Sequence, residues 1–158
     1  MDLNKVNHYM NLAIMEAKQA YHEDEVPIGC VIVSPHGEVL ASTHNLKEQN
    51  SDACAHAELL AIKEAGKKLK GWRLIDCSLF VTLEPCPMCM SAILQARFGK
   101  LYFGAYDKKG GAISLGYNFA KDKRLNHTFS ITGGIKHFEL SRMLSNYFRQ
   151  KRNLPPLK

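Results

Sequence analysis

The segment Thr82-Leu83-Glu84-Pro85-Cys86-Pro87-Met88-Cys89 constrains the fold more than any other part of the chain, because it joins a predicted strand to a predicted helix. The apolar run of residues 79–83 favours a buried strand, and helical spacing begins after it. Cys86 and Cys89 are three positions apart, so a helix would aim both sulfur atoms in the same direction. Pro87 suits the first turn of that helix, where its missing N–H costs no hydrogen bond. The segment therefore predicts two thiols held together at a strand-to-helix junction.

A second motif, Ala55-His56-Ala57-Glu58, lies upstream at another predicted helix start, and we expect both of its polar side chains in the first turn. A C-x-x-C pair by itself is typical of a redox site or of half a structural zinc site. A structural site needs a fourth protein ligand, but the chain has no second C-x-x-C pair. A redox pair would leave His56 and Glu58 without a role. We therefore predict catalytic zinc bound by His56, Cys86 and Cys89, with the fourth position left for water.

The two motifs together read H-x-E … P-C-x-x-C, and this pattern resembles the signature of zinc-dependent nucleoside and nucleobase deaminases. The resemblance implies one Zn²⁺ ion per subunit, with the imidazole and the two thiolates as its ligands. It also implies that Glu58 is not a ligand but moves protons between the water and the substrate ring. Hydrolytic deamination is the chemistry that this arrangement predicts.

The composition indicates a single deaminase domain spanning residues 1–158, because 46% of the residues are hydrophobic and 23% are charged. Residues 155–158 are expected to form a frayed tail. The chain has no apolar run of the length that crosses a membrane, and its first residues lack the order of a signal peptide. We therefore expect a soluble, cytoplasmic protein without a membrane partner. Cys30, Cys54 and Cys77 are expected to be small core residues.

The net charge of +6 is distributed unevenly along the chain. Residues 1–60 carry three Lys and Arg against nine Asp and Glu, a net charge of −6, whereas residues 61–158 carry eighteen against six, a net charge of +12. A segment this basic is typical of a surface that binds a polyanion such as RNA, but an ordinary solvated surface explains it equally well. The candidate contacts to RNA phosphates are Lys108, Lys109, Arg149, Lys151 and Arg152.

Hydrophobic periodicity predicts that strands alternate with helices, as in an α/β fold. We expect helices over residues 6–21, from 55 to about 66, from 86 to 96 and over 140–148, and strands over 28–33, 39–45, 79–83, 101–106 and 129–132. Leu46 to Asp52 is predicted to be a polar loop. The strand and helix around Cys86 indicate parallel strands, and ligands of open α/β sheets gather at the carboxyl ends of such strands.

Further segments make the chain similar to the bacterial-type tRNA adenosine deaminases, over about Asn7 to Arg152. These segments are Glu25-Val26-Pro27-Ile28-Gly29, Asn45, Arg73-Leu74-Ile75-Asp76, residues 79–86, Phe103-Gly104-Ala105, Asp107, Asn126-His127 and Phe148-Arg149. The resemblance implies a three-layer α/β/α sandwich with a five-stranded mixed sheet of the cytidine-deaminase type. It also implies a homodimer that converts the wobble adenosine of a tRNA anticodon loop to inosine.

The resemblance also implies which residues contact the substrate. Those lining the base pocket would be Ile28, Asn45, Ala57, Leu83 and Pro85, and those contacting the anticodon loop would be Asp107, Asn126 and His127. Independently of the resemblance, Asn45 closes a predicted strand just before the loop that leads to His56, so its amide could face the pocket as donor and acceptor. An Asn that caps a loop would explain that position equally well.

Two other functions are compatible with the zinc motif. A deaminase of free guanine or cytosine would share the motif in full, but it would not need the basic C-terminal segment, Asp107 or Asn126-His127. A non-catalytic, zinc-stabilised RNA-binding module would explain the basic charge, but it would not require Glu58 beside three ligands. Deamination of adenosine in tRNA accounts for both features, and it is the function that we predict.

Overall fold

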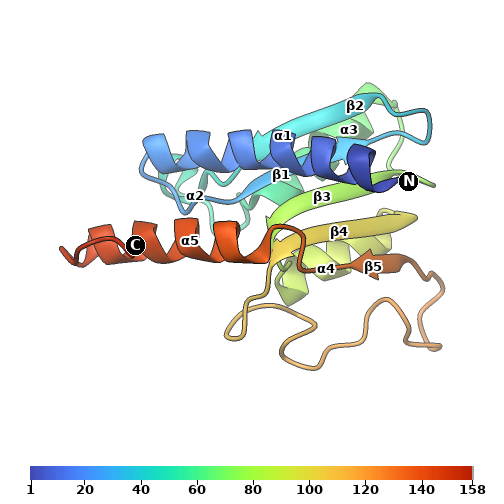
Figure 1. The fold of residues 1–158 in the computed structure, drawn as a ribbon. Coiled ribbons are helices and arrows are strands. Elements are labelled where there is room, and N and C mark those ends of the chain that lie inside the picture. Colours follow the sequence, from blue (N-terminus) through green and yellow to red (C-terminus); the bar gives the residue numbers. More distant parts are fainter. Residues whose placement is uncertain (158) are drawn as a thin grey trace.

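Five strands form one mixed sheet in the computed structural model, which describes residues 1–157 of the chain (Figure 1). The strands are β1 (Gly29–Val33), β2 (Val39–His44), β3 (Ser78–Leu83), β4 (Lys100–Ala105) and β5 (Ser130–Thr132). Their order across the sheet is β2-β1-β3-β4-β5. β1 is antiparallel to β2 and β3, whereas β3, β4 and β5 are parallel. The predicted five-stranded mixed sheet is confirmed.

Helices cover both faces of the sheet (Figure 1). α1 (Leu3–His22) and α5 (His137–Lys151) pack on one face, and α3 (Ala57–Lys68) and α4 (Pro87–Gln95) pack on the other. Successive side chains of a strand point to opposite faces, so Phe80 joins the core under α1 while its neighbours Leu79 and Val81 join the core under α3 and α4. Strands buried on both faces explain the continuous apolar runs in the sequence, and the predicted three-layer fold is confirmed.

Both α3 and α4 begin where the two sequence motifs lie. His56 is the N-cap residue of α3 and Cys86 is the N-cap residue of α4, each with extended backbone angles and neither with a capping hydrogen bond from its side chain. The prediction that His56 lies within the first turn is therefore wrong by one position, because α3 starts at Ala57. Since neither side chain caps its own helix, both are free to turn toward a common point.

Residues 47–50 form a short helix, α2 (Lys47–Asn50), so the prediction of a continuous polar loop is wrong here. The backbone N–H of Gln49 donates to a carboxylate oxygen of Glu25 at 2.8 Å. Ser51 ends the helix in the left-handed conformation, with a φ angle of 47°. A partner so distant in the chain leaves no periodic pattern around residue 47, which is why sequence reasoning missed this turn.

The remaining cysteines divide into two environments. Cys30 and Cys77 are buried, as predicted, but Cys54 is exposed, so its prediction as a core residue is wrong. Cys54 lies in the turn before α3, where its backbone N–H donates to the side chain of Asp52 at 2.7 Å.

Residues 155–157 are exposed, with the N–H of Leu157 donating to Asn146, while Lys158 lies outside the described residues. Among residues 1–157, no helix has the length and apolar character of a membrane span.

An imidazole joins the end of β2 to α1. His44 places its Nδ1 2.8 Å from a carboxylate oxygen of Glu16 and its Nε2 3.0 Å from one of Glu23. Burial opposes a charge on His44, but the two carboxylates outweigh this effect, so the pKa of His44 is raised. Because the folded-state pKa lies above the unfolded value, the stability from the imidazolium is complete below the unfolded pKa and is lost as pH rises through the folded pKa.

We expect His44→Gln to lower the free energy of unfolding by on the order of 1 kcal/mol near pH 6, and by less near pH 8.5, because only the charged ring can donate to both carboxylates. Urea unfolding at the two pH values measures the effect. His22→Gln is the control, since His22 is exposed at the end of α1, the helix that carries Glu16. An equal loss at both pH values would contradict the charged bridge.

Candidate active site

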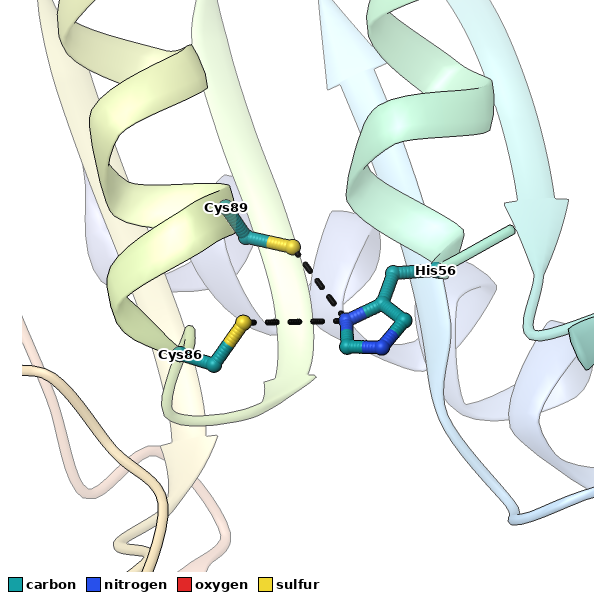
Figure 2. A group of neighbouring side chains, drawn as sticks. All are labelled: His56, Cys86 and Cys89. Atoms are coloured by element: carbon teal, nitrogen blue, oxygen red, sulfur yellow. Dashed lines mark hydrogen bonds between the residues drawn. The ribbon is translucent and has the colours of Figure 1, made fainter. Parts of the chain in front are cut away.

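Three side chains that could bind a metal converge beside the carboxyl end of β3 (Figure 2). His56 approaches from the start of α3, while Cys86 and Cys89 approach from the start of α4. The Nδ1 atom of His56 lies 3.7 Å from the sulfur of Cys86 and 3.4 Å from the sulfur of Cys89. The structure thus brings together the three residues that the sequence motifs selected.

The spacing of these atoms fits a zinc ion. Zinc bonds of tetrahedral geometry place a nitrogen and a sulfur ligand about 3.6 Å apart. The three donor atoms all lie within 4.8 Å of one another, and within residues 1–157 no other group of three His, Cys, Asp or Glu side chains converges in this way. One imidazole and two thiols form the donor set of a catalytic zinc site, with a fourth position left open.

The two thiols of the site differ in acidity. A hydrogen bond from Cys89 and another from His56 lower the pKa of Cys86 to about 4, despite its partial burial. The pKa of Cys89 is raised, because its thiol donates to Cys86 and is buried. A bound divalent cation would replace the shared proton and leave both sulfurs as thiolates. The group is therefore poised for a cation, with one sulfur already ionised at neutral pH.

Glu58 lies in the first turn of α3, beside the three donor atoms and with only 3% of its surface exposed. Burial raises its pKa. A carboxyl group whose pKa is raised toward neutrality can both accept and release a proton at physiological pH, as a general acid and base must. Glu58 therefore has the environment that proton transfer requires.

A cavity of about 370 Å³ opens over this group. The lining residues are Val26, Ile28, Asn45, Lys47, His56, Glu58, Leu83, Glu84, Cys86, Asp107, Leu144 and Phe148. They include four of the predicted substrate contacts, namely Ile28, Asn45, Leu83 and Asp107. Ala57 and Pro85 are buried directly beside the metal-binding side chains, since each is next to one of them in the chain. The cavity thus combines an apolar wall with a few polar groups, as small-molecule sites do.

Sequence reasoning missed several residues of the cavity. Leu144 and Phe148 lie in the helix predicted over residues 140–148, but only the packing of α5 against the sheet shows that they reach the site. Val26, Lys47 and Glu84 carry no pattern that marks them as lining residues. Their positions depend on contacts between segments far apart in the chain.

Two predicted RNA contacts lie elsewhere in the chain. His127 donates from Nε2 to the carbonyl oxygen of Phe98 at 2.7 Å, next to the amino end of β4, and Asn126 is its exposed neighbour. The cavity lies at the carboxyl ends of the parallel strands, where Leu83 and Asp107 are found. One chain therefore does not bring these two residues to its own site.

The basic candidates also differ in their surroundings. Lys108 and Lys109 are exposed and follow Asp107, which lines the cavity. Lys151 forms an ion pair with Asp24, and Arg149 donates to the carbonyl oxygen of Pro155. Arg152 is exposed at the end of α5. The two lysines after Asp107 are not engaged in an ion pair within residues 1–157.

A buried carboxylate sets the orientation of Asn45. Its Nδ2 donates to Glu25 at 3.0 Å, and Glu25 is completely buried. An ionised carboxylate can only accept, so the amide must present its nitrogen to Glu25 and its oxygen to the other side. No buried side-chain atom within residues 1–157 lacks a hydrogen-bond partner, so the unbonded oxygen of Asn45 opens onto the cavity. The cavity therefore contains an acceptor for a substrate donor.

A second cavity, of about 460 Å³, lies between α4, β4, β5 and the segment that joins β4 to β5. Its walls are mostly aromatic and aliphatic, and they include Phe103, Tyr117, Phe119 and Phe129. No carboxylate, imidazole or thiol lines it. This second cavity therefore lacks the acid–base and metal-binding groups that line the first.

The family to which the chain belongs agrees with this geometry. Residues 3–105 match the family model of the cytidine and deoxycytidylate deaminase zinc-binding region. This match covers α1 through β4, including both metal-binding motifs. The chain is a member of this zinc-binding deaminase family, and the matched region includes all three converging side chains.

The most similar proteins that we describe belong to one group within this family. The tRNA-specific adenosine deaminase of Bacillus subtilis is 46% identical over 91% of this chain and 89% of its own length, and that of Agrobacterium fabrum is 42% identical over 92% and 95%. A solved structure described in terms of A-to-I editing by tRNA:A34 deaminases at the wobble position is 41% identical, with a TM-score of 0.81 over 86% of this chain and 98% of its own. Within the deaminase family, the chain belongs with the tRNA-specific adenosine deaminases.

A guanine deaminase from Nitrosomonas europaea shares the fold but little sequence. Its structure matches with a TM-score of 0.75 and 20% identity, over 89% of this chain and 83% of that one. At this identity the match concerns the architecture alone. The sheet with helices on both faces is therefore shared with a deaminase named for another substrate. Substrate choice must then depend on the cavity and its surroundings.

We expect Cys86→Ala to lose most of its bound zinc, because one of three protein ligands is removed. Metal analysis of the purified protein measures the zinc content. Cys54→Ala is the matched control, since Cys54 is an exposed thiol outside the converging group, and it should keep the zinc content of the unaltered protein. Full zinc occupancy in Cys86→Ala would show that the ligand assignment is wrong.

Proposed function

We propose that this protein deaminates the wobble adenosine of a tRNA anticodon loop to inosine by hydrolysis, which releases ammonia. One zinc ion would be bound per chain by His56, Cys86 and Cys89. The observation that carries the proposal is the buried carboxyl group of Glu58 beside three converging donor atoms in one cavity. The tRNA-specific relatives support RNA as the substrate.

Glu58 performs the proton transfers in this proposal. When bound, zinc supplies Lewis-acid activation of water. Glu58 takes the proton of the attacking water, passes it to a ring nitrogen of the adenine, and later protonates the departing amine. The raised pKa of Glu58 suits a group that must accept and then donate within one turnover. The net reaction consumes one water and exchanges the exocyclic amine for a carbonyl oxygen.

The cavity walls hold the base and its sugar. Ile28, Leu83 and Phe148 offer apolar surfaces to the ring, and the oxygen of Asn45 accepts a hydrogen bond from the nucleotide. Ala57 and Pro85 complete the floor beside the metal, and Asp107 contacts the anticodon loop at the mouth. A base in an unpaired loop is extruded at little cost, because no base pair has to be broken.

A homodimer is the second part of the proposal. Ile113, Leu115 and Tyr117 are large apolar residues that stand exposed in the segment after β4, a surface that a second copy would cover. Asn126 and His127 lie away from the cavity of their own chain. In the dimer they would contact an anticodon loop that is bound at the cavity of the other subunit. Because tRNA is the substrate, we place the protein in the cytoplasm, without a membrane partner.

We expect the purified protein to sediment as a dimer at micromolar concentration. Leu115→Asp should shift it toward the 17.8 kDa monomer, because a charge would be buried in the proposed interface. Leu3→Asp is the control, since Leu3 is also exposed but lies on α1. A fully active protein that sediments only as a monomer would contradict this part of the proposal.

We expect Glu58→Ala to keep its zinc and its fold but to lose inosine formation by at least about 10²- to 10⁴-fold, because the group that transfers protons is missing. Inosine is measured in a short anticodon stem-loop that carries one adenosine at the wobble position. Glu64→Ala, at an exposed position on the same helix, is the matched control and should stay active. Nearly normal turnover by Glu58→Ala would rule out its catalytic role.

If Lys108 and Lys109 contact RNA phosphates, RNA binding should weaken as the salt concentration rises. Each phosphate contact on a single strand contributes about 0.7 to the log–log slope of affinity against salt, so Lys108→Ala with Lys109→Ala should flatten the slope by roughly 1.4. The paired control is Lys63→Ala with Lys67→Ala, on the exposed side of α3, which should leave the slope unchanged. Asn45→Ala should reduce turnover with little change in slope.

The same stem-loop separates the proposal from its competitor. A free-base deaminase would turn over guanine or cytosine efficiently and would show no salt-dependent affinity for RNA. Efficient turnover of either base, together with no inosine in the stem-loop, would overturn the proposed function.

A further inference from the structure

Glu84 is a buried carboxylate that neither binds the metal nor pairs with a cation. It follows β3, two positions before Cys86, and 2% of its surface is exposed. No Lys, Arg or His side chain within residues 1–157 forms an ion pair with it. Burying a charge in this way is costly unless hydrogen bonds satisfy it. Its partners therefore indicate why a carboxylate stands there.

All three hydrogen bonds to the carboxylate of Glu84 come from one short segment, residues 107–114. The backbone N–H of Asp107 donates at 2.9 Å, the backbone N–H of Ser114 at 2.7 Å and the hydroxyl of Ser114 at 2.6 Å. The first and last residues of the segment are thus tied to the same side chain. Hydrogen bonds to a charged acceptor are stronger than those between neutral groups.

Close packing of the same segment supports this reading. A Cβ atom added to Gly111 would lie 2.3 Å from the carboxyl carbon of Glu84, so the backbone approaches the carboxylate as only glycine permits. The N–H of Gly111 donates to the carbonyl oxygen of Asp107 at 2.9 Å, and that of Ala112 donates to Pro85 at 2.9 Å. The segment is therefore folded directly over Glu84.

The position of the segment matters for the cavity. Asp107 lines the cavity, and its side chain accepts a hydrogen bond from the backbone N–H of Lys109 at 3.0 Å. Holding the backbone of Asp107 consequently also orients the two lysines that follow it. We propose that Glu84 is a positioning residue, which anchors residues 107–114 and thereby places Asp107, Lys108 and Lys109 for the RNA; this role rests on the proposed function.

Glu84→Gln tests the anchor with almost no change of shape. An amide has one acceptor oxygen and one donor nitrogen. In Glu84→Gln the NH₂ group would therefore face a backbone N–H or a hydroxyl that donates a hydrogen bond to the carboxylate of the unaltered protein. Losing hydrogen bonds to a charged acceptor should raise the open fraction of the segment about tenfold. Lys108 and Lys109 are trypsin sites within it, so cleavage after either lysine should become about tenfold faster, as followed by mass spectrometry.

Two further variants and two measurements keep the test decisive. Ser114→Ala removes only the hydroxyl of an exposed residue and should accelerate the same cleavage by a few-fold, whether or not Glu84→Gln folds well. Glu139→Gln, on the exposed side of α5, should cleave like the unaltered protein. Zinc content and melting temperature report whether Glu84→Gln keeps its fold. Unchanged cleavage in both Glu84→Gln and Ser114→Ala would overturn the anchor.

A kinetic arm separates positioning from general structural damage. Glu84→Gln should raise the KM for the anticodon stem-loop about tenfold with a smaller effect on kcat, because the binding residues move while Glu58 does not. In an Asp107→Ala background the same substitution should have clearly less effect, because the two residues act through one contact. Fully additive effects would contradict the role. Cleavage needs no substrate, so an anchor confirmed by trypsin in a protein that makes no inosine would count against the proposed function alone.

Discussion

The convergence of two helix starts at one end of the sheet is the constraint on which the rest of the site depends. β3 leads straight into α4, and the start of α3 is placed beside it, so that His56, Cys86 and Cys89 face one another. Helical spacing brings the two sulfur atoms together, but only the packing of α3 beside α4 brings the imidazole of His56 within 4.8 Å of them. The buried strands and the helices packed on them supply the rigid frame that metal binding needs.

Buried carboxylates extend this frame to the substrate side of the cavity. Glu25 orients the amide of Asn45, and Glu84 receives the hydrogen bonds of residues 107–114. Glu58, the third carboxyl group of the region, is buried beside the three donor atoms and performs proton transfer in the proposed function. Three acidic side chains buried near one cavity therefore have different tasks, and their hydrogen-bond partners distinguish them.

The division between chemistry and recognition explains how one architecture serves several substrates. The guanine deaminase of Nitrosomonas europaea shares the fold at 20% identity, whereas the tRNA-specific adenosine deaminases of Bacillus subtilis and Agrobacterium fabrum are 46% and 42% identical to this chain. The metal-binding group requires only the starts of α3 and α4. In the proposed function, recognition of a large substrate instead involves the segment beyond β4, which carries Asp107, the two lysines and the exposed apolar residues.

The sequence by itself determined which three side chains form the candidate metal site, the buried strands and the α/β class, because these features follow from local spacing and periodicity. Only the tertiary structure decided that Leu144 and Phe148 reach the cavity and that Cys54 is exposed. It also decided that residues 47–50 form a short helix, in which the backbone N–H of Gln49 donates to Glu25. It also placed His127 beside Phe98, away from the site of its own chain. The physical reason is common to these cases: each depends on a partner many residues away, and a contact of that kind leaves no periodic trace in the chain.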